Sequence, residues 1–348
     1  KWMRANYGKP LRQWLKQQNI VEIIDFGDLP VFKQATTYPC ILVIKKAAPG
    51  TQFAATNVRT LDFFDLTTCV TENRHEVRQV ALDDSGWALV NEKTQDLLDK
   101  LRNTGIPLGK YVNGKIYRGV LTGLNEAFVI DAETRDMLIS ADPKSEELIK
   151  PFLFGRDIKR YRRPHSERYL IFTRRGILID QYPAIKKHLH QYKERLTPRP
   201  ANWKGDKWPG RKPGSYQWYE IQDAIDYYKE FEKPKIIVPA IVKDASYILD
   251  NDKFYSNDKT SIIRTDDLYL LGLLNSSALD FALHSIASTK QGGYFEYKPM
   301  YIQQLPIRTI DFSHPADKAC HDRMVELVER MLDLNKQLAE AKVPQTKT

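Results

Sequence analysis

The chain has 348 residues, of which 42% are hydrophobic and 28% are charged, and its formal net charge is +9. This length can bury one large core or two moderate ones, and we expect two. No apolar run is long enough to span a bilayer, so no integral membrane protein is expected. Cys40, Cys69 and Cys320 form no CxxC pair, so neither a disulfide framework nor a zinc site is indicated. A reducing cytoplasm is the expected compartment.

The first residues have the pattern of the inside of a domain. A helix is predicted over residues 2–18, followed by strands over residues 20–26 and 38–45. Because these strands are continuously apolar, we expect them to be buried on both faces, as in an α/β sheet. The chain starts at Lys1 without an initiator Met or a leader, so it is expected to be a piece of a longer protein.

The middle of the chain predicts mixed helices and strands. A helix is expected over residues 85–103, with Ser85 as its N-cap and Gly105 at its end. Residues 197–215 are dense in Pro, Gly and Trp, so they are expected to form a long ordered loop. Short strands are predicted over residues 117–120, 127–130, 169–172, 235–238 and 262–264.

The last third is apolar first and then amphipathic. Residues 269–284 predict a helix packed on both sides, followed by a loop with the pair Gly292 and Gly293. After Pro315 a long helix is expected, with apolar residues alternately three and four positions apart. These residues form a seam that can make a coiled coil or pack on the parent protein. The seam comprises Met324, Leu327, Met331, Leu334, Leu338 and Ala341.

The positive charge is concentrated in residues 150–220. This block holds 18 Lys and Arg against 6 Asp and Glu, a net charge of +12, and it includes Trp203, Trp208 and Trp218. Cationic side chains neutralise phosphates, and flat rings pack on sugars and bases, which favours nucleic acid as the ligand. A solvated basic face with core tryptophans would have the same composition. No amphipathic helix accompanies the block, so no membrane partner is expected.

The chain lacks the motifs of an active site. It has no Pro-Pro pair, which the base-holding loop of adenine methyltransferases requires, and no glycine-rich cofactor turn. The triplets at residues 157–159 and 296–298 have the outline of a magnesium-dependent nuclease site, but such triplets arise by chance in a chain this charged. We therefore expect no catalytic residue, no metal ligand and no cofactor in this chain itself.

Three segments carry a resemblance to a known family. They are residues 117–131 (YRGVLTGLNEAFVID), residues 152–161 (FLFGRDIKRY) and residues 269–307, which contain Leu-Leu-Asn-Ser and end in Leu-Pro-Ile. Together they resemble the TaqI-like C-terminal specificity domain of adenine-specific DNA methyltransferases and type IIG restriction-modification enzymes. Residues 1–50 are similar to the end of a methyltransferase catalytic domain.

The resemblance implies a mixed α/β (α+β) fold in three parts. Residues 1–55 would be the tail of an upstream methyltransferase domain, residues 56–310 a DNA target recognition domain, and residues 311–348 a C-terminal helix. The upstream domain would bind S-adenosylmethionine and flip an adenine, while this chain holds double-stranded DNA and reads base edges in the major groove.

Several functions remain open at this point. The parent is expected to be a site-specific adenine DNA methyltransferase of a restriction-modification or phage-defence system, such as a BREX system, with an endonuclease either fused or separate. One alternative is a protein-interaction module that docks a restriction or defence subunit through the C-terminal helix. Another is the specificity domain of an RNA methyltransferase.

Sixteen side chains are candidates for contact with nucleic acid. Most are cationic, and the others are polar groups on two glycine-bearing loops. The alternative for the first loop is a tight turn that is only structural and needs positive φ at Gly119 and Gly123. Phe152, Phe154 and Ile158 are expected in the core. The candidates are Arg118, Thr122, Asn125, Lys159, Arg160, Arg162, Arg163, Arg174, Arg175, Lys204, Arg211, Lys212, Lys290, Gln291, Tyr294 and Lys298.

Overall fold

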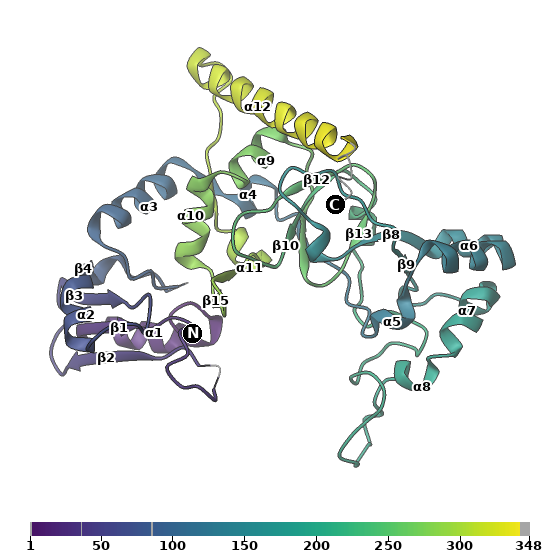
Figure 1. Cartoon of the computed structure of the whole chain (residues 1–348), viewed down its shortest axis with the longest axis horizontal. Coiled ribbons are helices and arrows are strands. Elements are labelled where there is room, and N and C mark those ends of the chain that lie inside the picture. The colour runs from purple at the N-terminus through teal and green to yellow at the C-terminus, as the bar shows by residue number, and fades with distance from the viewer. Residues whose placement is uncertain (1, 36, 85, 342–348) are drawn as a thin grey trace, which may run out of the picture. The chain divides into compact units, whose positions relative to one another are not determined.

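The computed structural model describes residues 2–35, 37–84 and 86–341, and these form two compact units, each with helices and sheets (Figure 1). The first unit holds the described residues up to 114 together with residues 241–245 and 273–319. The second unit holds residues 115–240, residues 246–272 and the described residues from 320 on. The mixed α/β class is confirmed. The units cut across the three expected segments, because two later stretches of chain return to the first unit.

The first unit is built on a four-stranded sheet and two small ones, in the orders β2-β1-β3-β4, β11-β16-β15 and β17-β5. Its helices are α1 (Lys9–Lys16), α2 (Leu66–Asn73), α3 (Glu92–Thr104), α4 (Leu108–Tyr111), α10 (Ser277–Ile286) and α11 (Pro299–Ile302). Its strands are β1 (Asn19–Asp25), β2 (Cys40–Lys45), β3 (Gln52–Asn57), β4 (His75–Arg78), β5 (Ile106–Pro107), β11 (Ile241–Val242), β15 (Thr289–Lys290), β16 (Tyr294–Glu296) and β17 (Pro306–Ile307).

Both faces of strand β1 are covered. On one face Ile23 packs with Leu15 of α1, which runs along the sheet in Figure 1, and on the other face Ile24 packs with α2. The expected burial on both faces is wrong for β2, where Ile41 and Val43 are about two-fifths exposed. Strand β2 is the edge strand and has β1 as its single neighbour, so much of its apolar surface remains in contact with solvent.

Capping residues decide where the helices of the first unit begin. Helix α3 starts at Glu92, where Asn91 Oδ1 accepts a hydrogen bond from Thr94 N at 3.0 Å, and it ends at Gly105 as predicted. The expected N-cap, Ser85, lies outside the described residues. The single helix expected over residues 269–284 is instead two, α9 (Leu268–Leu274) and α10, because Ser276 caps the second one.

The second unit contains two four-stranded sheets, in the orders β12-β10-β14-β6 and β13-β8-β9-β7. Its strands are β6 (Ile116–Arg118), β7 (Val129–Ile130), β8 (Ile149–Leu153), β9 (Tyr169–Ile171), β10 (Lys235–Pro239), β12 (Ile248–Asp250), β13 (Tyr255–Ser256) and β14 (Thr260–Ile263). Its helices are α5 (Asn125–Phe128), α6 (Ala132–Ala141), α7 (Pro183–His190) and α8 (Lys193–Leu196), and α12 (Pro315–Glu340) enters it at residue 320.

Four of the five predicted short strands are confirmed within one to two residues, and the fifth is half wrong. Asn125–Phe128 form the short helix α5, and only Val129–Ile130 form a strand. Strand β10 is fixed to β12 by a fully buried ion pair between the cross-strand partners Lys235 and Asp250, with Nζ and Oδ2 2.5 Å apart. This pair stabilises the register between β10 and the edge strand β12.

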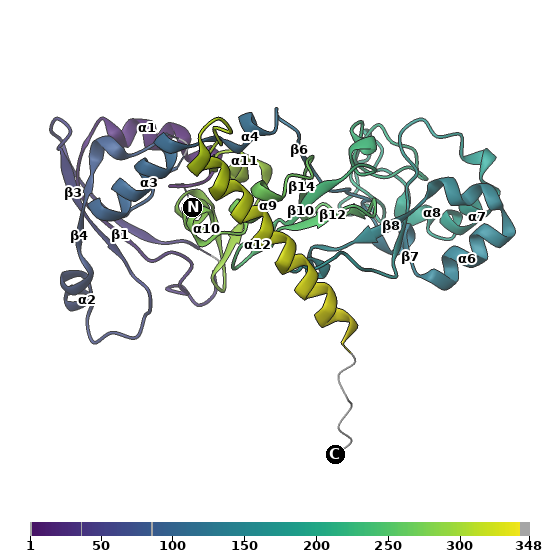
Figure 2. The ribbon, with the colours of Figure 1, turned by 90° about the horizontal axis from the view of Figure 1, so that it is seen from above.

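Helix α12 is one unbroken helix, as predicted (Figure 2). It packs through Val328, and it lies close to α9 at Gly272, where a Cβ on the glycine would be 2.7 Å from Met324 Sδ. Leu334 and Leu338 of the predicted seam are 47% and 75% exposed. The helix is therefore buried at Val328, which is not a seam residue, while Leu327, Met331, Leu334 and Leu338 of the seam are exposed. No helix among the described residues is long and apolar enough to cross a membrane.

The long loop predicted over residues 197–215 is confirmed. The structure has no helix or ladder strand between α8 and the 3-10 turn Tyr228–Glu230, apart from an isolated bridge between Pro198 and Arg211.

Candidate nucleic-acid interface

The loop of residues 118–125 connects β6 to α5 and holds the first three candidates. Gly123 adopts a φ of +83°, as predicted, but Gly119 does not have a positive φ. Gly119 is required for another reason, since a Cβ there would lie 1.9 Å from Asn257 O. Thr122 is buried, and its Oγ1 donates to Oδ1 of the exposed Asn125 at 2.7 Å. Asn125, the first residue of α5, therefore presents an exposed amide at the end of the loop.

Arg118 is half-exposed and held in place by two carboxylates. Its Nη1 lies 3.5 Å from Asp223 Oδ2, and its Nη2 lies 3.2 Å from Asp258 Oδ2. Tyr227 donates from its hydroxyl to Arg118 O at 2.8 Å and stacks on Tyr117 with ring centroids 4.7 Å apart. A guanidinium held in this way keeps some of its N–H donors exposed. It can donate to a phosphate or a base edge with little loss of side-chain conformational entropy.

Arg211 does not have the place that the sequence suggested. It is 4% exposed, and desolvation lowers its pKa to about 10. Its guanidinium donates to five backbone carbonyls, so it holds the chain together and has no donor left for DNA. The acceptors are the carbonyl oxygens of Leu196, Thr122, Glu220, Gln217 and Trp218.

Arg175 joins the same arrangement. It donates from Nη1 to Ile221 O at 2.8 Å and from Nη2 to Gln222 O at 2.6 Å, and Glu220 lies 3.5 Å away. The neighbouring Arg174 is exposed and lies over the ring of Tyr228. The structure therefore brings together three segments that are distant in sequence, around residues 118–125, 173–176 and 211–223. This set is called the loop cluster below.

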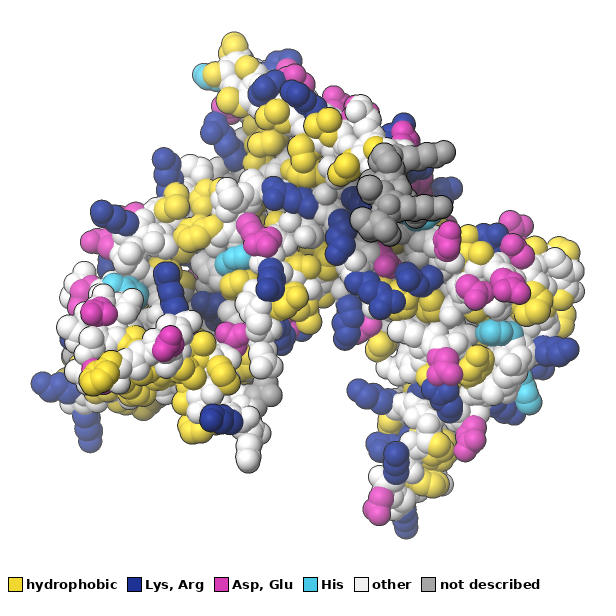
Figure 3. Space-filling view, viewed as in Figure 1, with side chains coloured by type: hydrophobic (Ala, Val, Ile, Leu, Met, Phe, Trp, Pro, Cys, Tyr) yellow, Lys and Arg dark blue, Asp and Glu magenta, His cyan; other side chains and the backbone are white. Residues whose placement is uncertain are grey.

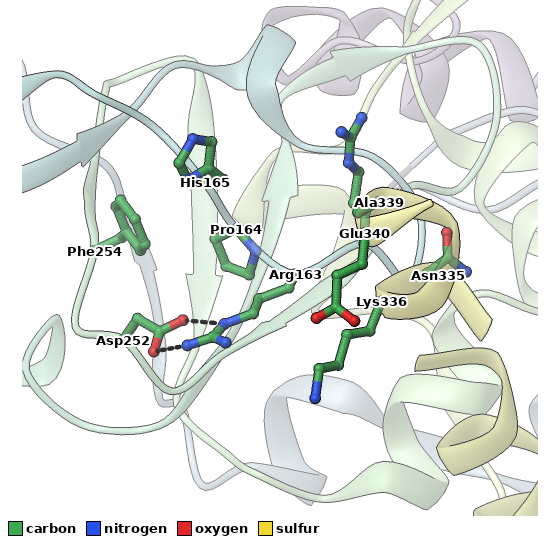
Figure 4. A pocket seen from close by; sticks show the side chains of 10 residues that line it. Arg163, Pro164, His165, Asp252, Phe254, Asn335, Lys336, Ala339 and Glu340 are labelled. Carbon is green, nitrogen blue, oxygen red and sulfur yellow. Dashed lines mark hydrogen bonds and ion pairs between the residues drawn. The ribbon is translucent and has the colours of Figure 1, made fainter. Parts of the chain in front are cut away.

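The basic segment of residues 159–163 lies elsewhere on the second unit. Lys159, Arg160, Arg162 and Arg163 are exposed, as expected, and Phe152 and Ile158 are buried. Phe154, expected in the core, is only partly buried at its edge. Arg163 forms a bidentate pair with Asp252 at 2.9 and 3.0 Å, in a pocket of about 520 Å³ that Lys336 and Glu340 of α12 also line (Figure 4).

Lys204 and Lys212 are exposed on the long loop after α8. Lys and Arg side chains are numerous along this projecting loop, as the dark blue atoms at the lower right of Figure 3 show.

The remaining four candidates belong to the first unit. Three are on the hairpin of β15 and β16, and Lys298 follows it as the N-cap of α11. Lys290 and Lys298 both place Nζ 2.7 Å from Glu296 Oε1. Burial raises the pKa of Glu296, but the hydrogen bonds from the two lysines outweigh it, so the pKa lies below its ordinary value. The lysine charges are thus partly neutralised, while Gln291 and Tyr294 are exposed at the turn.

The sequence analysis missed the carboxylates that position the arginines. Asp223 and Asp258 lie 105 and 140 residues after Arg118, and nothing local in the sequence links them to it. Among the described residues no cluster of His, Cys, Asp and Glu could hold a metal ion. The exposed polar side chains of the loop cluster include the cations Arg118 and Arg174 and the amide of Asn125.

Comparison with known proteins agrees with the sequence motifs. Residues 150–307 match the model of the TaqI-like C-terminal specificity domain. The chain is 24% identical over 339 residues to the Type II methyltransferase M.PaeR7I of Pseudomonas aeruginosa, covering 90% of this chain and 55% of that protein. It is 23% identical to the Type II restriction enzyme and methyltransferase RM.Eco57I of Escherichia coli, covering 92% of this chain and 35% of that protein.

A solved structure has a similar fold. It is the Type IIL restriction-modification enzyme MmeI in complex with DNA, with a TM-score of 0.50 and 12% identity, covering 97% of this chain and 45% of that one. The chain thus spans about half the length of M.PaeR7I and of MmeI, or less in the case of RM.Eco57I. Residues 150–307 of this chain thus match the model of the same family that the motifs resemble, the TaqI-like C-terminal specificity domain.

Proposed function

We propose that this chain is the sequence-specific DNA recognition part of a restriction-modification N6-adenine methyltransferase. One observation carries the proposal: the segment that matches the specificity domain, residues 150–307, contains the whole block with a net charge of +12. A cationic surface supplies affinity for DNA phosphates, and the domain type belongs to enzymes that choose a DNA sequence.

The loop cluster supports a role in reading DNA. Arg118 is held by Asp223 and Asp258, and Asn125 is exposed at the other end of the same loop. Arginine and asparagine are the side chains that form bidentate hydrogen bonds with guanine and adenine in the major groove. We assign base contacts to this cluster and phosphate contacts to Lys159, Arg160 and Arg162.

The catalytic steps are assigned to the rest of the parent protein. M.PaeR7I is a methyltransferase, and this chain spans only 55% of it. We propose that the part of the parent outside this chain binds S-adenosylmethionine and flips the target adenine. We also propose that the parent protein acts in the cytoplasm and in phage defence.

Binding to a randomised 30-base-pair duplex pool, followed by sequencing of the bound fraction, tests the recognition function. The expected result is enrichment of one short motif, with weaker binding to RNA of the same sequences in a competition gel. Preference for RNA would favour the RNA methyltransferase alternative. Calorimetric titration of the chain with S-adenosylmethionine should show no binding heat, and a micromolar dissociation constant would contradict the assignment of the cofactor site to the rest of the parent.

A second function is favoured by the exposed side of α12. Leu327, Met331, Leu334 and Leu338 lie at helical spacing and are 41% to 75% exposed. We propose that this stripe packs against another helix of the parent or of a nuclease or defence subunit. Replacing Leu327 and Leu334 by Gln should abolish association with that partner while DNA binding is unchanged. Association that persists in this variant would remove the stripe from the interface.

A further inference from the structure

Residues 198–211 form a projecting loop with a closed base, called the finger below. Arg199 N donates to Arg211 O at 3.0 Å, and Arg211 N donates to Thr197 O at 3.1 Å, so the two ends of the loop are paired. The finger extends away from the sheets of the second unit beyond α8 (Figure 1). The buried guanidinium of Arg211 anchors its base to the loop cluster.

The finger is stiffened by an aromatic pair. Trp208 donates from Nε1 to Thr197 O at 3.0 Å, and Trp203 meets it edge to face with ring centroids 4.9 Å apart. The chain passes close over the indole of Trp203 at Gly205, where a Cβ would lie 2.5 Å from Cζ2. Trp203 is nevertheless 43% exposed, so part of its ring faces solvent on a supported loop.

The exposed charges of the finger are almost all positive. Arg199, Lys204 and Lys207 are exposed, and Asp206 is the one acidic residue of the segment. Among the ion pairs of the described residues, none involves these three cations. Prolines at 198, 200 and 209 further restrict the backbone, so the charges are displayed with little conformational entropy to lose on binding.

We infer that the finger binds the sugar–phosphate backbone of duplex DNA beside the bases that are read, and so contributes affinity that does not depend on sequence. The inference rests on the proposed DNA-recognition function. An ammonium group suits a phosphate as a point charge, and an exposed indole suits the apolar edge of a deoxyribose. Asn202 is the one amide of the segment that could hydrogen-bond a base edge, so the chemistry of the finger favours the backbone.

The test removes the charges of the finger and compares the result with a matched loss of charge. The variant is R199A/K204A/K207A, and the control is K46A/K93A/K100A, which removes three exposed cations from the first unit. Both are titrated with a fluorescent duplex pool of random sequence at several salt concentrations, and thermal unfolding checks that each is folded.

The finger variant should bind the random pool about tenfold or more weakly, and the slope of log affinity against log salt should decrease in magnitude by about 2.7, since each phosphate contact contributes about 0.9. The control should keep the wild-type slope. The motif selected from the pool should be the same for all three proteins. W203A should weaken binding to random duplex, and W203F should restore most of it.

Two outcomes would overturn the inference while leaving the proposed function intact. In the first, the wild-type chain binds duplex DNA and the finger variant has the same affinity and salt slope. In the second, the variant selects a different or degenerate motif, which would mean that the finger reads bases. If the wild-type chain itself binds no duplex, the proposed function fails, and the inference with it.

Discussion

Arg211 shows how one side chain can join segments that sequence alone leaves separate. Its guanidinium is buried, and it connects the end of α8, the loop at Thr122 and the turn before Glu220. A buried cation is stable in such a place because its donors are matched by carbonyl acceptors, of which Thr122 O and Gln217 O also accept a backbone N–H.

We therefore expect Arg211→Met to lower the free energy of unfolding by about 3 kcal/mol or more, because it removes a buried charged donor set and leaves several carbonyls unsatisfied. Chemical denaturation followed by circular dichroism measures the change. The adjacent Lys212 is exposed, so Lys212→Met should change stability by less than about 0.5 kcal/mol and serves as the control. Equal stability of the two variants would contradict the role of Arg211.

His188 gives stability a pH dependence. It is partly buried on α7, its Nε2 lies 3.1 Å from Ala127 O, and desolvation lowers its pKa below the ordinary value of 6.5. The unfolded chain therefore binds a proton more readily than the folded one. The contribution of His188 to stability is complete above pH 6.5 and is lost as the pH falls from there towards the lower folded pKa.

His188→Gln should lose less stability than the wild type between about pH 7.5 and about pH 5.5, because the neutral amide does not titrate. Denaturant midpoints at the two pH values give the comparison. His284, whose pKa is also lowered mainly by burial, is present in both proteins and cancels in the difference. An identical loss in both proteins would show that His188 does not contribute.

At the scale of elements, α12 has two faces with different roles. Val328 is 2% exposed, whereas Leu334 is 47% exposed. The buried face lies close to Gly272 of α9. The exposed apolar stripe of Leu327, Met331, Leu334 and Leu338 is the surface that we propose for a helical partner.

Val328→Ala should lower the free energy of unfolding by about 1–3 kcal/mol, because it leaves a cavity in a packed contact. Leu334→Gln should lower it by less than about 0.5 kcal/mol, since that side chain is already half in solvent. Thermal unfolding of the two variants beside the wild type tests the assignment. A larger loss for Leu334→Gln would mean that the helix packs through the opposite face.

At the scale of the whole molecule, the positive charge is not spread evenly. Residues 150–220 carry a net charge of +12, whereas the whole chain carries +9, so the remainder of the chain has a net charge of −3. All of these residues belong to the second unit. Association with DNA should therefore be dominated by this unit and should depend strongly on ionic strength.

If the block makes about six to ten phosphate contacts, affinity for duplex DNA should fall by on the order of a thousandfold or more between 50 and 200 mM salt. Fluorescence anisotropy with a labelled random-sequence duplex measures this. An affinity that changes less than about tenfold over that range would show that only a few phosphates are contacted, and the basic block would then be a solvated face.

The sequence by itself determined what depends on local pattern and composition. The long loop after α8, the helix from Pro315, the end of α3 at Gly105 and the positive φ of Gly123 all follow from neighbouring residues. The motifs in residues 117–131, 152–161 and 269–307 likewise sufficed to indicate the family whose model matches residues 150–307. These features are readable because capping, periodicity and turn chemistry act over a few positions.

Only the tertiary structure decided which charged groups are exposed and which are buried. Arg211 and Lys212 are adjacent and chemically alike in sequence, yet one is buried among carbonyls and the other is exposed. Arg118 is positioned by Asp258, 140 residues away, across the pairing of β6 with β14. Such contacts are fixed by sheet register and long-range packing, which bring together residues that no local pattern relates.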